Sequence, residues 1–274
     1  MSFFNVNEQK CRRCGICIAE CPNRLILSDD NTRMPKLRIN GEEDCILCGH
    51  CVAACPFDAL YLSPLAADGF LPLRKELNIS FEQADQFLKS RRSIRSFKNT
   101  QVSDDELAKI MDTARFAPTA SHRQTIRWLL VKDPAKTHRL AEMVIEWMSE
   151  VRKNHPEQAR KHKMAGLIAG WRRGHDMILR GAPHLAVAYT ETESHWYVID
   201  AAIALTYLEL AAHSLGVGAC WAGFLSQAAL IHQPIKDFLG LPESAQIHGG
   251  QMLGYPKYPY PRLPWRKPLE LRIL

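Results

Sequence analysis

The spacing of hydrophobic and polar positions changes from helical to extended between residues 103 and 134. In "VSDDELAKIMDTARFAPTA" the apolar side chains recur at intervals of three and four residues: Leu107, Ile110, Met111 and Ala114. This period places them on one face of a helix. Ser103, with Glu106 three positions later, has the pattern of a capping box. We therefore predict a helix that begins near residue 104 and ends before Pro118.

Short apolar runs bounded by polar or turn residues predict the strands. Four segments have this pattern: 125–134, 184–191, 217–224 and 245–256. Residues 135–180 are helical and charged, and residues 198–215 are apolar almost all round, as in a helix at the centre of a core. With a helical pattern from Phe81 onward, the order is helix–helix–strand–helices–strand–helix–strand–helix–strand, without a regular βαβ repeat.

Composition narrows the class of protein without identifying it. The chain has 274 residues, 46% hydrophobic and 23% charged, which are ordinary values for one large or two smaller globular domains. No apolar run is long enough for a membrane span, and the N-terminus lacks the apolar core of a signal peptide, so we expect a cytoplasmic protein. The net charge of +6 suits an anionic cofactor or an acidic partner as well as a solvated surface. We expect no nucleic-acid partner, because no motif of that kind is present.

Eight of the nine cysteines fall into two copies of one spacing, C-x2-C-x2-C-x3-C-P. The first copy ends at Pro22 and the second at Pro56. Zinc sites usually pair two C-x2-C knuckles at longer separation, and disulfides are rare in cytosolic proteins. The spacing therefore favours iron–sulfur clusters, with structural zinc as the alternative.

Residues 3–62 resemble bacterial-type two-[4Fe–4S] ferredoxins, in which the fourth cysteine of each motif ligates the other cluster. The resemblance implies that one cluster is held by Cys11, Cys14, Cys17 and Cys55. It implies that the second is held by Cys45, Cys48, Cys51 and Cys21. The segments that follow the motifs, "NRLILSD" and "FDALYLS", are expected to form short strands.

The division of the chain follows from this resemblance and from the composition after it. Residues 63–80 contain two prolines, a glycine and several charges without a regular period, which indicates a linker. We therefore expect a two-cluster ferredoxin-like domain at 1–62, a linker at 63–80 and a second domain at 81–274.

The second domain contains an arginine-rich segment, "KSRRSIRSFKN", whose guanidinium and hydroxyl groups suit a phosphate. Three further segments follow in order: "ARFAPTASHRQ", "IDAAIALTYLELAAHSLGVGACWAGF" and "RLPWRKPL". Together these four segments resemble the nitroreductase family of FMN-dependent enzymes over residues 85–274. The resemblance implies an α+β fold, with an antiparallel-dominated sheet around a central helix, and an intertwined homodimer with FMN at the interface.

The resemblance also implies which residues contact FMN. The phosphate and the ribityl or ring oxygens would be contacted by Arg91, Arg92, Ser93 and Arg95, with Arg266 and Lys267 completing the phosphate site. The flavin would be lined by Pro118, Thr119, Ala120, Ser121 and His122. Its reactive edge would lie beside Trp221, Ala222 and Gly223, where a backbone N–H could bond N5. Outside this set, we expect Cys220 to be a buried apolar thiol and His213 to be a structural histidine.

We expect an FMN-dependent oxidoreductase. Electrons would come from a low-potential donor, such as a ferredoxin or a ferredoxin-reducing oxidoreductase, or from NAD(P)H. They would pass through the two clusters to FMN and on to an electron-poor small molecule: a nitroaromatic, a quinone, an activated alkene or another flavin. One alternative is an electron relay to a protein partner without a small substrate, and another is a zinc-binding scaffold. A homodimer is expected because the apolar helix and the proline-rich tail both call for a partner surface.

Overall fold

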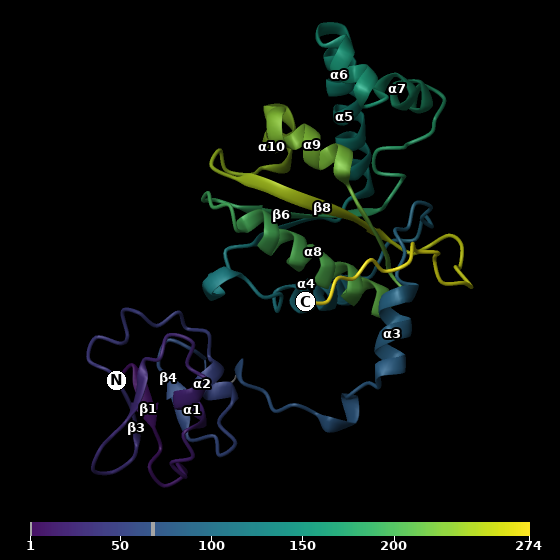
Figure 1. Cartoon of the computed structure of the whole chain (residues 1–274). Coiled ribbons are helices and arrows are strands. Elements are labelled where there is room, and N and C mark those ends of the chain that lie inside the picture. The colour runs from purple at the N-terminus through teal and green to yellow at the C-terminus, as the bar shows by residue number, and fades with distance from the viewer. Residues whose placement is uncertain (1, 67–68) are drawn as a thin grey trace. The chain divides into compact units, whose positions relative to one another are not determined.

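The computed structural model describes residues 2–66 and 69–274, which divide into two compact units. One unit is built on residues 1–78 and the other covers most of residues 79–274 (Figure 1). The expected linker, 63–80, includes residues 67–68, which lie outside the described residues.

The first unit contains two short antiparallel strand pairs and two single-turn helices. β1 (Phe4–Val6) pairs with β4 (Leu60–Leu62), and β2 (Ile26–Ser28) pairs with β3 (Pro35–Leu37). The helices are α1 (Ile16–Ala19) and α2 (His50–Ala53), one inside each cysteine motif. Each begins after a glycine in the left-handed region, Gly15 at φ 77° and Gly49 at φ 70°, a conformation that glycine adopts without steric cost. The strands expected after each motif are therefore present, as β2 and β4.

The second unit is built around a four-stranded antiparallel sheet of order β5-β6-β8-β7. The strands are β5 (Arg127–Val131), β6 (His184–Thr190), β7 (Gly218–Trp221) and β8 (Gln246–Gly254). All four lie inside the segments predicted from the sequence. The antiparallel sheet is the one expected from the resemblance.

Eight α-helices surround this sheet in the described part of the second unit. They are α3 (Phe81–Ser90), α4 (Asp104–Ala114), α5 (Pro134–Asn154), α6 (Pro156–Lys161), α7 (Met164–Arg172), α8 (Tyr197–Ser214), α9 (Gly223–Ile231) and α10 (Gln233–Leu239). Short 3₁₀ turns occur at Lys75–Leu77 and Ala120–His122. The capping box predicted for α4 is present, with the Ser103 side chain accepting from the Glu106 N–H and the Glu106 side chain accepting from the Ser103 N–H.

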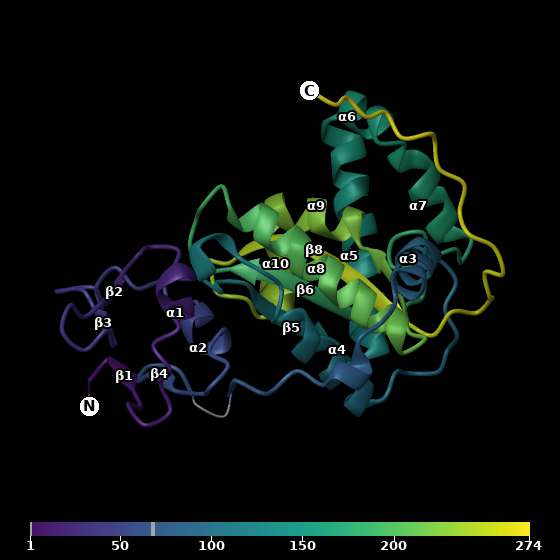
Figure 2. The same ribbon diagram turned by 60° about the horizontal axis from the view of Figure 1, so that its bottom comes forward.

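The charged helical stretch predicted for 135–180 is divided into three helices. α5 ends at Asn154 because Pro156 follows, and a proline disfavours helical geometry in the residue before it. α6 and α7 are separated by Lys163, whose φ of 53° is left-handed. α5 extends beyond the sheet, and α6 and α7 pack near the end of α5 that is far from the sheet (Figure 1, Figure 2).

The helices cover both faces of the sheet. α8 and α4 lie on one face, and α5, α9 and α10 lie on the other (Figure 1). The core under α4 and α8 includes Leu107, Ile110 and Leu208, and the core on the opposite face includes Leu140 and Met148. These five side chains are at most 1% exposed.

α8 does not lie entirely inside the core, as its apolar sequence had predicted. Leu205 and Leu208 are fully buried against the sheet, whereas Val198 is 57% and Ile199 48% exposed. An apolar face left in water is unfavourable, so the exposed side of α8 calls for a further surface to cover it.

His184 links β6 to two neighbouring segments and generates a prediction about pH. Its Nδ1–H donates to the Lys132 carbonyl at 2.9 Å, and its Nε2 accepts from the Val102 N–H at 3.0 Å. The ring is 1% exposed, and burial is the main cause that lowers its pKa below the usual 6.5. At a pH just below 6.5, the unfolded chain therefore begins to protonate this histidine, whereas the folded protein keeps the ring neutral.

We predict that the free energy of unfolding of the second unit falls as the pH is lowered below about 6.5, because the unfolded chain then binds more protons than the folded one. His184→Gln should make this dependence shallower. Tryptophan fluorescence during denaturation reports on this unit alone, since all six tryptophans lie beyond residue 127. His155→Gln, at an exposed position, is the control. An unchanged pH dependence in His184→Gln would contradict the prediction.

Candidate functional site

The eight motif cysteines form two groups in the first unit. A cavity of about 300 Å³ is lined by Cys11, Cys14, Cys17 and Cys55. A second space, of about 20 Å³, is lined by Cys45, Cys48, Cys51 and Cys21. Each group thus contains three cysteines of one motif and the last cysteine of the other. The second space has room for about one water, so its walls must move apart to admit a cluster.

Backbone N–H groups and burial both affect the protonation of these thiols. The Leu25 N–H donates to Cys21 Sγ at 3.3 Å, and the Ala59 N–H donates to Cys55 Sγ at 3.4 Å. Burial is the main cause that raises the pKa of Cys51 to about 12, and neighbouring thiols add to it. Burial likewise raises the pKa of Cys17 and Cys45. Four thiolates gathered this closely need compensating cations, which iron ions would supply.

The geometry of the first group fits a multi-atom cluster. Within residues 2–66 and 69–274, no set of three or more His, Cys, Asp or Glu side chains converges as the ligands of a single metal ion would. The four thiols of the first group instead border a space large enough for several atoms.

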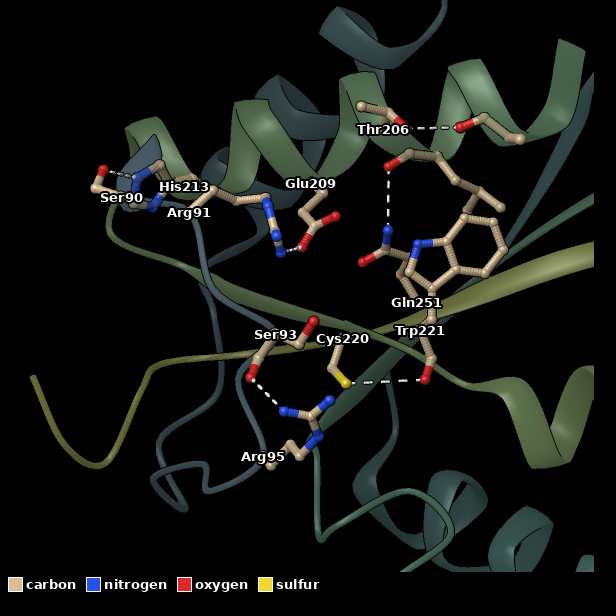
Figure 3. Close-up of polar contacts among 12 residues, drawn as sticks. Ser90, Arg91, Ser93, Arg95, Thr206, Glu209, His213, Cys220, Trp221 and Gln251 are labelled. Atoms are coloured by element: carbon tan, nitrogen blue, oxygen red, sulfur yellow. Dashed lines mark hydrogen bonds and ion pairs between the residues drawn. The ribbon is translucent and has the colours of Figure 1, made fainter. Parts of the chain in front are cut away.

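In the second unit, arginines converge on a separate cavity. A space of about 200 Å³ is lined by Arg91, Arg92, Ser93, Arg95 and Arg266 (Figure 3 shows three of them). No carboxylate is among these lining residues, so the guanidinium groups of Arg92, Arg95 and Arg266 favour an anion between them. This set fits the phosphate of FMN. Lys267, the sixth residue expected here, is exposed and does not line the cavity.

The arginine-rich segment is held in place by β7. The Ile94 N–H donates to the Ala219 carbonyl at 2.9 Å, so the chain runs beside the strand directly after α3. The approach is close: a Cβ on Gly218 would lie 2.5 Å from the Ile94 side chain. Glycine at this position therefore allows the segment to pack on the sheet.

Arg91 also forms an ion pair with Glu209 on α8 (Figure 3). The distance between Arg91 Nη1 and Glu209 Oε1 is 2.7 Å, and Glu209 is 6% exposed. Beside this pair, His213 Nε2 and Ser90 Oγ are 3.0 Å apart, which fits the structural role expected for His213. The sequence analysis missed Glu209, although an acidic residue inside an apolar helix is a signal for a buried partner.

A larger cavity lies next to the arginine group. Its volume is about 410 Å³, and its lining includes Arg95, Arg180, Cys220, Trp221 and Gly223. Arg95 lines both cavities, so the arginine cavity and the cavity beside Trp221 are neighbours. Cys220 is 5% exposed, with burial raising its pKa, as expected for a buried apolar thiol.

The backbone beside Trp221 offers a donor at Gly223 rather than at Ala222. The Ala222 N–H already donates to the Gly250 carbonyl at 2.8 Å. Gly223 is the first residue of α9, and N–H groups in the first turn of a helix have no acceptor within the helix. The Gly223 N–H, rather than that of Ala222, therefore suits a ring atom.

The residues expected to line the flavin ring lie elsewhere in the same chain. The Ala120 N–H donates to Asp200 Oδ1 at 3.0 Å, which fixes residues 118–120 near the start of α8. Arg91 is paired near the other end of this helix, nine residues later, or about 13 Å along the axis. Neither of the cavities lined by Arg95 includes residues 118–122. Asp200 was not predicted from the sequence; its Oδ2 is buried and has no partner among the described residues.

The fold and these cavities define a redox protein with an α+β domain and a cysteine-rich N-terminal unit. Residues 88–255 match the nitroreductase family, and residues 10–59 match the 4Fe-4S dicluster domain. The chain belongs to the nitroreductase family and has an N-terminal iron–sulfur domain of the ferredoxin type. The expectation of an FMN-dependent oxidoreductase with an α+β fold is confirmed.

Related proteins match about two thirds of the chain. A protein of Archaeoglobus fulgidus, provisionally named NADH dehydrogenase/NAD(P)H nitroreductase, is 25% identical over 64% of this chain and 87% of its own length. The FMN reductase (NADPH) of Bacillus subtilis is 26% identical over 60% of this chain and 62% of its own length. No helix among the described residues is long and apolar enough to cross a membrane.

Solved structures share the fold. A nitroreductase with bound FMN from Bacteroides fragilis is 25% identical and superposes with a TM-score of 0.56, covering 70% of this chain and 98% of its own. A second, from Desulfitobacterium hafniense, is 22% identical with a TM-score of 0.54, covering 69% and 98%, and supports the fold alone.

Arg91 is paired with Glu209 and also lines the arginine cavity, which generates a prediction with a matched control. Arg91→Ala should weaken FMN binding by about tenfold to a hundredfold, since a charged hydrogen bond contributes about 1.5–3 kcal/mol. It should also destabilise the second unit, because Glu209 would be left buried and unpaired. The loss should be less than the roughly 3–5 kcal/mol of a fully buried pair, since the Arg91 side chain is 26% exposed.

Two further variants separate these effects. Arg91→Ala combined with Glu209→Gln should recover stability without recovering FMN affinity. Arg266→Ala should weaken FMN binding without destabilising the protein, because Arg266 is exposed and forms no ion pair with a described residue. Fluorescence titration with FMN and denaturation curves measure both quantities. FMN affinity in Arg91→Ala equal to that of the parent would refute the assignment.

Proposed function

We propose that the protein takes single electrons from a low-potential donor into two [4Fe–4S] clusters and passes them to FMN. The final acceptor is an electron-poor small molecule: a nitroaromatic, a quinone, an activated alkene or another flavin. The donor is a ferredoxin-type protein or a ferredoxin-reducing oxidoreductase. NAD(P)H is a second source, because the names of related proteins include it. The grouping of eight thiols into two sets of four, on a chain of an FMN-dependent family, is the observation that carries the proposal.

The first unit holds the clusters in this proposal. One cluster is bound by Cys11, Cys14, Cys17 and Cys55, and the other by Cys45, Cys48, Cys51 and Cys21. The N–H groups of Leu25 and Ala59 stabilise the negative charge on the two crossed ligands. The corresponding domains are 1–62 and 81–274, joined by 63–80.

The second unit holds FMN through its own side chains and backbone. The arginines of the 200 Å³ cavity, with Ser93, bind the phosphate, and Lys267 adds positive charge nearby. Arg95 extends this contact toward the flavin ring, which occupies the cavity beside Trp221, with the Gly223 N–H as a donor. When bound, FMN can accept electrons one at a time and deliver them as a pair.

The flavin site is completed in a homodimer. Within one chain, Ala120 and the arginine cavity lie near different ends of α8, and neither cavity lined by Arg95 includes residues 118–122. The exposed apolar face of α8 supplies a surface for a second copy. Residues 118–122 of one copy would then line the flavin bound by the arginines of the other.

A charge on this face should therefore break both the dimer and the FMN site. Val198→Glu should give a monomer by analytical ultracentrifugation and lower the FMN content. Ile39→Glu, at a position 92% exposed in the first unit, is the matched control and should change neither. A Val198→Glu dimer with full FMN content would show that this face is not the interface.

Electron transfer through the clusters is tested in the full chain. Protein made anaerobically should contain about eight iron and eight sulfide per chain. Cys14→Ser with Cys48→Ser should abolish flavin reduction by reduced ferredoxin, while dithionite still reduces the flavin. Ile39→Ser, at a 92% exposed position of the first unit outside both thiol groups, should leave both reactions unchanged. Full ferredoxin-dependent reduction in the cluster-deficient variant would refute the route.

The distribution of charge favours a second candidate, an electron relay to a protein partner. Residues 151–175 contain seven of the 35 lysines and arginines and one of the 29 acidic residues, so the remainder of the chain is balanced at 28 of each. All seven cations are exposed, and none forms an ion pair with a described carboxylate. Such a surface attracts an acidic protein. Steady-state turnover with small acceptors supports the enzyme, and transfer only to an acidic redox protein supports the relay.

A further inference from the structure

The two thiol groups of the first unit differ in the charges around them. The cavity bordered by Cys14 is also lined by Arg12, Arg13 and Arg33, and no acidic residue is among its lining. Arg13 is held toward the β2–β3 hairpin, where its Nε–H donates to Met34 Sδ at 3.4 Å. Asp29 of that hairpin is paired with Lys36 at 2.9 Å, so this carboxylate is already balanced.

The other thiol group has no charged residue in its lining. Besides its four cysteines, the walls are Phe4, Pro22, Asn23, Leu25, Ile26, Leu37, Ile46, Gly49 and Leu62. Asp44, beside Cys45 in the sequence, forms an ion pair with Arg38. The lining of this site is apolar and carries no charged side chain.

The two groups also differ in exposure. Cys14 of the first group is exposed, whereas Cys51 of the second is buried. Water and cations thus reach one set of ligands more readily than the other.

The difference in charge and the difference in exposure both favour reduction of the same cluster. Adding one electron to a cluster adds one negative charge, with no bond formed or broken and no proton required. Nearby guanidinium groups and water stabilise that charge, and an apolar wall penalises it. Net charge, hydrogen bonds and solvent exposure are the factors by which a protein sets the potential of such a cluster.

We infer that the cluster of Cys11, Cys14, Cys17 and Cys55 has the higher reduction potential and takes the first electron, and that Arg12, Arg13 and Arg33 set this difference. The inference rests on the proposed crossed assignment of ligands. The second electron, from the same one-electron donor, enters the apolar site at a lower potential. The three arginines are positioning residues: they do not ligate iron but determine where the first electron resides.

The test is a redox titration of the full-length protein, prepared anaerobically and followed by electron paramagnetic resonance. The parent should show two separate one-electron steps. Arg12→Gln, Arg13→Gln and Arg33→Gln, singly and together, should shift the higher step to lower potential and leave the lower step in place. Arg24→Gln is a matched control, because Arg24 is exposed, shares the left-handed conformation of Arg13 and Arg33, and lines neither site.

Cys21→Ser assigns the steps, since it should alter the signal of the lower-potential cluster and spare the other. Coincident steps in the parent, or arginine variants that move the lower step, both steps equally or neither, would overturn the inference. Iron and sulfide analysis separates this failure from that of the proposed function. Protein without about eight iron lacks the clusters themselves, whereas fully loaded protein with equal potentials refutes only the role of the arginines.

Discussion

The ion pair between Arg91 and Glu209 fixes the start of the arginine-rich segment on which the candidate phosphate site depends. Glu209 lies on a largely apolar helix and is 6% exposed, so without a partner its carboxylate would be strongly unfavourable. Arg91 supplies the compensating charge directly after α3 ends. The pair therefore joins α3 to α8 and starts the following segment beside β7. The other arginines of that segment then face one cavity.

The sequence predicted those elements of the second unit that local signals determine. The capping box of Ser103 and Glu106 and the four strands needed only spacing and propensity, and the structure contains all of them. α8 shows the limit of such signals. Its composition indicates burial on every side, but whether the burying surface belongs to the same chain or to another is a tertiary property. Val198 and Leu208 have the same hydrophobic character and opposite environments in one copy.

The candidate sites likewise divide into features that local sequence signals predict and features that tertiary packing decides. Cysteine spacing alone indicated iron–sulfur chemistry, because few other sites require four thiols in eleven residues. The partners of the flavin residues could not be found in this way. Asp200 contacts a backbone N–H 80 residues away, and Glu209 contacts an arginine 118 residues away. Such contacts depend on how helices pack, and no local pattern encodes them. The hydrogen bond from the Ala222 N–H to the Gly250 carbonyl of β8 likewise depends on tertiary packing. The Gly223 N–H, rather than that of Ala222, is therefore the candidate donor.

Two cysteine motifs of identical spacing need not give two equivalent sites. The spacing fixes the ligands, whereas the residues between and after them fix the environment. The first motif has Arg12 and Arg13 where the second has Ile46 and Leu47, and the hairpin beyond the first motif adds Arg33. A repeat that is symmetric in its ligands is thus asymmetric in charge. Two centres of unequal potential can hold electrons that arrive singly, in a defined order, until a cofactor that delivers pairs can accept them.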